Sequence, residues 1–180
     1  MLLFVCMLTG CANNTTNIDR AINLRNKLLA ANGCKFKANI TADYMEFLHE
    51  FQLECQCDST GNISFVVTEP ITISDITGSI SQKGGTITFD EQVLAFESII
   101  EGNLSPVSAP WLFMEALRGG YIKACSAEED SLYIQIDDTY GGNPISFEIW
   151  TNASDLLTHV DISTDGRRIM SIAVESFAIL

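Results

Sequence analysis

Residues 34–57 read CKFKANITADYMEFLHEFQLECQC and carry the clearest structural pattern in this chain of 180 residues. From Phe36 to Tyr44, apolar or small side chains occupy every second position, and polar ones lie between them. The same alternation returns from Phe51 to Cys57. Such alternation is typical of antiparallel strands with one buried and one wet face. With a turn within Tyr44–His49, the stretch predicts a β-hairpin.

The period of two continues along the rest of the chain. It predicts eight further strands, over Ile63–Thr68, Asp75–Gln82, Thr86–Asp90, Tyr121–Cys125, Leu132–Asp138, Ile145–Trp150, Thr158–Ser163 and Arg168–Phe177. Glycine-rich turns such as Gly84-Gly85 and Asp165-Gly166 separate several of them. About ten strands in sequential order form a large antiparallel sheet, and an apolar face that wide must curl or be covered.

Three segments have helical spacing. The first is Ile18–Asn32, with Ile18, Ala21, Ile22, Leu28 and Leu29 on its apolar face, and it follows a polar tether at residues 11–17. The other two are short, at Gln92–Glu101 and Pro110–Arg118. We therefore expect an α+β fold, with a large curved antiparallel sheet (an unclosed half-barrel), an N-terminal helix and two short lid helices. Residues 18–180 form a single domain.

The composition excludes one class of partner. The chain has ten Lys and Arg residues and 23 Asp and Glu residues, so its formal net charge is −13. This balance repels polyanions, and we expect no nucleic acid among the partners.

The sequence Leu8-Thr9-Gly10-Cys11 follows an apolar run from Met1 to Met7. It resembles the lipobox of bacterial lipoproteins, which implies a signal peptide at 1–10, lipidation at Cys11 and anchoring on the extracytoplasmic face of the cell membrane. The apolar run is shorter than the roughly 20 residues of a membrane-spanning helix. Because it lacks the Lys or Arg of an export signal, we expect the true start to lie upstream of Met1.

Four cysteines follow Cys11, namely Cys34, Cys55, Cys57 and Cys125. An even number in an exported protein is what a set of disulfides would give. Cys34 shares the buried parity of its strand, and Cys55 and Cys57 share that of the next. We therefore expect Cys34 to bond either Cys55 or Cys57, the choice depending on the strand register.

The short helices would cover the inner face of a curved sheet without necessarily filling it, which leaves room for an apolar ligand. The cavity residues expected on this basis are Val93, Phe96, Ile100, Trp111, Leu112 and Leu117. An equally physical alternative is that the helices pack down and leave an ordinary core. General burial tendencies favour that alternative for the side chains of Trp111, Phe113 and Met114.

The order of elements resembles the bacterial lipoprotein-carrier superfamily, which includes the LolA and LolB sorting proteins. The details that most resemble small lipoproteins of Gram-positive clostridia are Ile76-Thr77-Gly78, Leu104-Ser105-Pro106, Pro110-Trp111 and Asp165-Gly166-Arg167-Arg168-Ile169. The resemblance implies an unclosed barrel, an apolar cavity, a lipid or acyl-chain ligand and no catalysis.

The sequence contains no recognisable catalytic, metal or cofactor motif. His49 and His159 are isolated, and neighbours such as Asp137 and Asp138 point to opposite faces of a strand. Arg167 and Arg168 could bind a lipid phosphate, although basic residues beside a turn more often pair with nearby acids.

Two functions stay open from the sequence. The first is a membrane-anchored, non-enzymatic protein that binds a lipid or acyl chain. The second is an interaction module that regulates a cell-wall or spore-envelope protein and has no small ligand.

Overall fold

The computed structural model describes residues 12–44, 48–96, 99–100, 103–140 and 142–180. The helices are α1 (Ala12–Ala30) and α2 (Ala109–Gly119), with short 3-10 turns at Ile71–Ile73 (η1) and Pro106–Ser108 (η2). The strands are β1 (Gly33–Asp43), β2 (Leu48–Asp58), β3 (Ile63–Glu69), β4 (Thr77–Ser81), β5 (Gly84–Phe89), β6 (Gln92–Phe96), β7 (Ile99–Ile100), β8 (Asn103–Leu104), β9 (Tyr121–Glu128), β10 (Ser131–Tyr140), β11 (Asn143–Thr151), β12 (Leu157–Thr164) and β13 (Arg167–Ile179).

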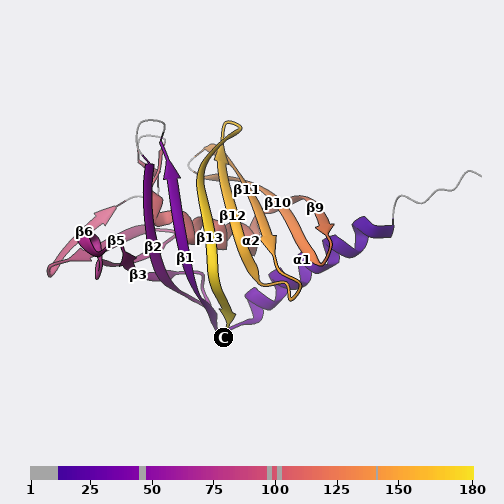
Figure 1. The fold of residues 1–180 in the computed structure, drawn as a ribbon, viewed down its shortest axis with the longest axis horizontal. Coiled ribbons are helices and arrows are strands. Elements are labelled where there is room, and N and C mark those ends of the chain that lie inside the picture. Colours follow the sequence, from indigo (N-terminus) through magenta and orange to yellow (C-terminus); the bar gives the residue numbers. More distant parts are fainter. Residues whose placement is uncertain (1–11, 45–47, 97–98, 101–102, 141) are drawn as a thin grey trace, which may run out of the picture.

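Eleven strands form one antiparallel sheet in the order β6-β5-β4-β3-β2-β1-β13-β12-β11-β10-β9. The sheet does not close, because β6 and β9 lie at opposite edges (Figure 1). All ten expected strands are present, so the predicted half-barrel is confirmed. The β1–β2 hairpin has the predicted parity, with Phe36 opposite Cys55 and Ala38 opposite Leu53.

The prediction of a first lid helix at Gln92–Glu101 is wrong. Its first five residues form the edge strand β6, which pairs with β5. Asp90 and Glu91 join the two strands, with φ angles of 48° and 64°. Two consecutive left-handed residues make the tight hairpin turn whose twist matches that of the strands, so this stretch continues the sheet.

Helix α1 begins at Ala12, earlier than expected, so most of the segment expected as a tether forms its first turns. Its packed face consists of Ala21, Leu24 and Leu28, each at most 2% exposed. Ile18, Ile22 and Leu29 were expected on the same apolar face, but they are 41–48% exposed. The apolar surface of α1 is therefore wider than the part that the domain buries.

The helix predicted at residues 110–118 is present as α2; it packs against the inner face of the sheet and lies behind the strands in Figure 1. Phe113 packs against Phe36 of β1 with a ring separation of 5.4 Å, and Phe36 stacks on Phe177 of β13. The residues of α2 that are buried are Ala109, Pro110, Trp111, Leu112, Phe113, Met114, Ala116 and Leu117. This helix is thus part of the core.

Arg25 of α1 fixes the end of α2. Its Nε donates to the carbonyl of Leu117 at 2.6 Å, and its Nη2 donates to the carbonyl of Gly120 at 2.7 Å. The last carbonyls of a helix have no partner within the helix and carry partial negative charge, so a guanidinium stabilises them. This contact ties the two helices together and sets where α2 ends.

The strand register answers the question that the sequence left open for Cys34. Cys34 lies directly opposite Cys57 across β1 and β2, whereas Cys55 lies opposite Phe36. Interaction between the two thiols raises the pKa of Cys34 and lowers that of Cys57. Both residues are 1% exposed and, like Cys55 and Cys125, they are free thiols in this structure.

We predict that oxidation links Cys34 to Cys57. Closing a loop of this length stabilises a fold by about 3 kcal/mol. Cys57→Ser should therefore lower the free energy of unfolding of the oxidised protein by roughly that amount, and a reductant should remove most of the difference. Cys125→Ser is the control: it keeps both cysteines of the pair and should lose stability on reduction as the wild type does, whereas Cys57→Ser should respond little to reductant. Non-reducing peptide mapping that finds Cys34 and Cys57 alkylated without prior reduction would contradict the prediction.

Candidate functional site

Strands β3 to β6, which we call the wing, extend the sheet beyond the β1–β2 hairpin and lie at the left of Figure 1. Their inner face is lined by aromatic rings that lie on glycines. A Cβ atom on Gly78 would lie 2.3 Å from Cζ of Phe65, and one on Gly85 would lie 2.3 Å from Cζ of Phe96. Glycine is therefore required at both positions, because any side chain would displace the rings.

A hollow of about 620 Å³ lies between α2 and the wing, and we call it the α2–wing hollow. Trp111 and Glu115 contribute from consecutive turns of α2, and Ile80 contributes from β4. The other lining residues are polar or small: Thr60, Gly61, Asn62, Ser79, Ser81, Gln82 and Lys83. The volume falls within the range of about 300–1,000 Å³ that is usual for small-molecule sites.

A second hollow of about 740 Å³ lies beside the β4–β5 hairpin and includes Phe96 and Ala95 of β6. It shares Ser79, Ser81 and Lys83 with the α2–wing hollow. The two hollows therefore border the same hairpin.

The expected cavity residues do not form one wall. Trp111 lines the α2–wing hollow and Phe96 lines the second hollow. Leu112 and Leu117 are core residues that are 0% and 3% exposed. Val93, on edge strand β6, is 64% exposed. The side chain of the sixth residue, Ile100, lies outside those that the structure describes.

Glu115 is the carboxylate of the α2–wing hollow. Burial raises its pKa above the ordinary value of 4.5, although the nearby guanidinium of Arg118 opposes the shift. Arg118 itself donates to the carbonyl of Ser59 at 2.9 Å. The hollow thus contains an acid that burial already drives toward its neutral form.

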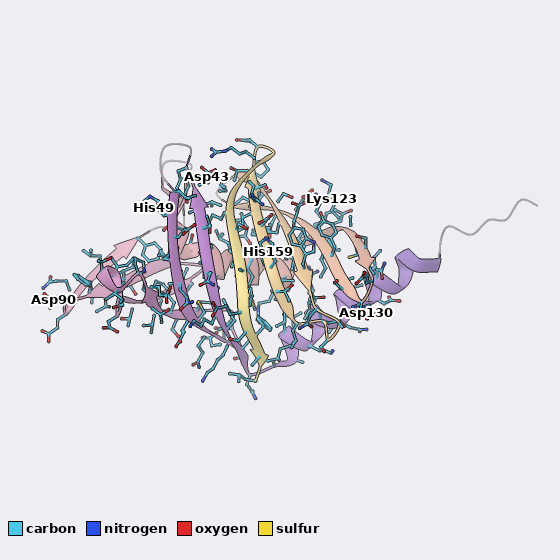
Figure 2. The ribbon with its side chains drawn as sticks, viewed as in Figure 1. Asp43, His49, Asp90, Lys123, Asp130 and His159 are labelled. Carbon is cyan, nitrogen blue, oxygen red and sulfur yellow. The ribbon has the colours of Figure 1, made fainter. Side chains whose placement is uncertain are left out.

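The sequence did not indicate a polar cluster on the outer face of the sheet, where Figure 2 shows His159 turned away from α2. Nε2 of His159 lies 2.8 Å from Oδ1 of Asp161 and 3.3 Å from Oγ of Ser171, and its ring packs on Trp150. His159 and Asp161 lie two residues apart on β12, and the pairing of β12 with β11 and β13 brings Trp150 and Ser171 to them.

This serine, histidine and aspartate do not form a proton relay. A catalytic triad uses one imidazole nitrogen for the serine and the other for the aspartate. Here both partners contact the same nitrogen. Burial would raise the pKa of Asp161, but hydrogen bonds from Ser171, Arg168 and His159 outweigh it and hold that pKa below its ordinary value.

The two arginines considered for phosphate binding pair with acids instead. Arg167 contacts Asp43 at 2.9 Å, and Arg168 contacts Asp161 at 3.0 Å. Asp137 likewise pairs with Lys123 at 2.9 Å. Across the described residues, no group of three His, Cys, Asp or Glu side chains is placed to hold a metal ion.

Neither helix, within the described part of the chain, combines the length and apolar character needed to cross a membrane. No protein-family model and no curated protein matches the sequence.

Solved structures do share the fold. The chain is similar to a DUF1329 family protein from Desulfovibrio piger, at 7% identity and a TM-score of 0.51, over 93% of this chain and 93% of that chain. It is also similar, at a TM-score of 0.46 and 7% identity, to a LolA superfamily protein from Nitrosomonas europaea, over 89% of this chain and 93% of that one. The lipoprotein LppX of Mycobacterium tuberculosis aligns at 9% identity and a TM-score of 0.43, over 90% and 93% of the two chains. The likeness to the Desulfovibrio protein, which spans nearly all of both chains, shows a common fold.

Proposed function

We propose that this protein is a bacterial lipoprotein, anchored through Cys11 on the extracytoplasmic face of the cell membrane, that binds a lipid or acyl chain without catalysing a reaction. The observation that carries this proposal is the hollow between Trp111 of α2 and Ile80 of the wing. No covalent chemistry is needed for this role.

The proposed ligand follows from the lining of the hollow. Trp111, 6% exposed, is the apolar side chain that borders the hollow, whereas Ile80 is 1% exposed and belongs to the core. Contact with the indole favours hydrocarbon through removal of water. Hydroxyl, amide and ammonium groups of Thr60, Asn62 and Lys83 line the rest of it. An amphiphile matches such a lining, with its chain against Trp111 and its polar end toward these groups.

A different observation supports the interaction module as the second candidate. The β5–β6 hairpin exposes Phe89, Val93 and Leu94 at 54–66%. An exposed apolar edge strand is a template for pairing with a strand of another protein. Native mass spectrometry of the protein from its own membranes separates the two candidates: a bound lipid supports the first, and a stoichiometric envelope protein supports the second.

We predict that Cys11→Ser releases the protein from the membrane. Two or three acyl chains hold a protein on a bilayer, whereas the described helices offer no membrane-spanning alternative. The variant should appear in the soluble fraction and lose labelling by a palmitate analogue. Cys6→Ser is the control and should stay labelled and membrane-bound. Labelling that persists without Cys11 would refute the assignment.

We predict that Gln82→Trp weakens binding of a fluorescent acyl-chain probe by about tenfold or more, which corresponds to about 1.4 kcal/mol. Gln82 is an exposed residue of the β4–β5 turn that lines the α2–wing hollow, so an indole there should fill ligand space while leaving the core intact. Ala153→Trp, at an exposed turn of the opposite half of the sheet, is the control. Equal affinity of the two variants, measured by fluorescence titration, would place the ligand elsewhere.

We predict that a probe with a phosphocholine head group, whose charge is constant, binds more tightly as the pH falls toward 5. A chain that excludes water from Glu115 raises its pKa further, so the bound state takes up a proton. Glu115→Gln should bind tightly at neutral pH and lose this pH dependence. Glu148→Gln, on the outer face, should keep the wild-type profile. An unchanged profile in Glu115→Gln would show that Glu115 does not contact the ligand.

The same shift gives a sign for stability. The pKa of Glu115 is raised in the folded protein. The contribution of this carboxyl to the free energy of unfolding is therefore fully present below about pH 4.5, and it is lost as the pH rises through the pKa of the folded state. Urea unfolding of ligand-free Glu115→Gln at neutral pH should therefore show equal or greater stability than the wild type.

A further inference from the structure

Helix α1 carries an apolar stripe that the domain does not cover. Ile18, Ile22 and Leu29 are 42%, 41% and 48% exposed. At 3.6 residues per turn, these three positions fall within about 40° of one another around the helix. They lie on one side of the helix, with Arg25 between Ile22 and Leu29, and we call these three residues the α1 stripe.

Packing inside the domain does not account for the α1 stripe. The buried side of α1 consists of Ala21, Leu24 and Leu28, and α1 contacts β9, β10 and α2. Arg25 lies near the same angular position around the helix as the three stripe residues. Its guanidinium turns away from solvent toward the last carbonyls of α2. The stripe therefore flanks the packed face and is made of isoleucine and leucine side chains.

The charge around the stripe indicates what can cover it. Among 23 acidic residues in the chain, α1 holds one, Asp19. Its two arginines are engaged within the domain, Arg20 with Asp155 at 2.7 Å and Arg25 with the last carbonyls of α2, so its low acid content is what distinguishes α1. Another exposed apolar group, on the β5–β6 hairpin, is flanked by Asp90 and Glu91. Anionic bacterial membranes repel acidic surfaces. Of these two surfaces, α1 is the one suited to a bilayer.

The position of α1 in the molecule also favours the lipid bilayer as the partner of the α1 stripe. The helix begins at Ala12, the residue that follows Cys11. Its first turns and the wing lie at opposite ends of the long axis of the molecule (Figure 1). A lipid on Cys11 would hold the bilayer next to α1 and leave the wing away from it.

We infer that the α1 stripe docks on the lipid bilayer, so that α1 lies in the membrane interface beside the anchor. This inference rests on the proposed anchoring at Cys11. Three half-exposed side chains bind a bilayer weakly by themselves, and the anchor makes the contact intramolecular and thus favourable. Docking would hold the domain in one orientation on the membrane.

Hydroxyl-radical footprinting of the full chain tests the inference. The lipidated protein in phosphatidylcholine–phosphatidylglycerol vesicles is compared with the soluble Cys11→Ser protein. Ile18, Ile22 and Leu29 should lose most of their oxidation in vesicles. Phe89, Val93 and Leu94, which are at least as exposed, should be oxidised equally in both samples and serve as internal controls.

A chemically lipidated chain keeps the two hypotheses separate. In Cys6→Ser protein, a diacyl maleimide coupled to Cys11 supplies the anchor even if the cell does not, because the four cysteines of the domain are buried. Protection of the stripe in this sample supports docking whatever the outcome for natural lipidation. Oxidation of the stripe that equals that of the soluble protein overturns docking, and it leaves an anchor shown by fractionation intact.

Discussion

The rest of the structure depends on one constraint: the inner face of an eleven-strand sheet that does not close must be removed from water. On the neighbouring strands β1 and β13, this face presents Phe36, Ile40, Ile172 and Phe177, which are all nearly inaccessible to solvent. Helix α2 meets the demand by burying eight residues against it. Each large side chain buried in this way stabilises the fold by about 1.5–3 kcal/mol. Helix α2, clamped at its end by Arg25, shares this role with α1, which contacts β9 and β10.

The same constraint explains where space remains. The helix of 11 residues is too short to cover every strand, and it lies against the half of the sheet that includes β10 and β1. In the wing, the rings of Phe65 and Phe96 lie close against Gly78 and Gly85, where there is no side chain between ring and backbone. What is left between Trp111 and Ile80 is a hollow with mixed lining. Space for a ligand is therefore a consequence of how far α2 reaches.

The sequence predicted the sheet well because the period of two survives in nearly every strand, and α2 well because Pro110 and Gly119 mark its limits. It failed at Gln92–Phe96, where the spacing of Val93, Leu94 and Phe96 is compatible with either period and the decisive turn uses two acidic residues rather than Asn-Gly. Leu112 and Leu117 were expected in a cavity wall, because an apolar pattern cannot tell a ligand surface from a core. The His159 cluster depends on register across three strands, which no local pattern contains.

The two edges of the sheet differ in a way that bears on function. Strand β9 lies against α1 and carries Lys123, so that edge is protected from pairing with other chains. Strand β6 is exposed and uncharged over its five residues, and it is preceded by Asp90 and Glu91. A short strand beside like charges pairs weakly with copies of itself, since a chain of net charge −13 repels its own kind. The free edge is thus compatible with a monomer, and it stays available to a partner whose charge complements the wing.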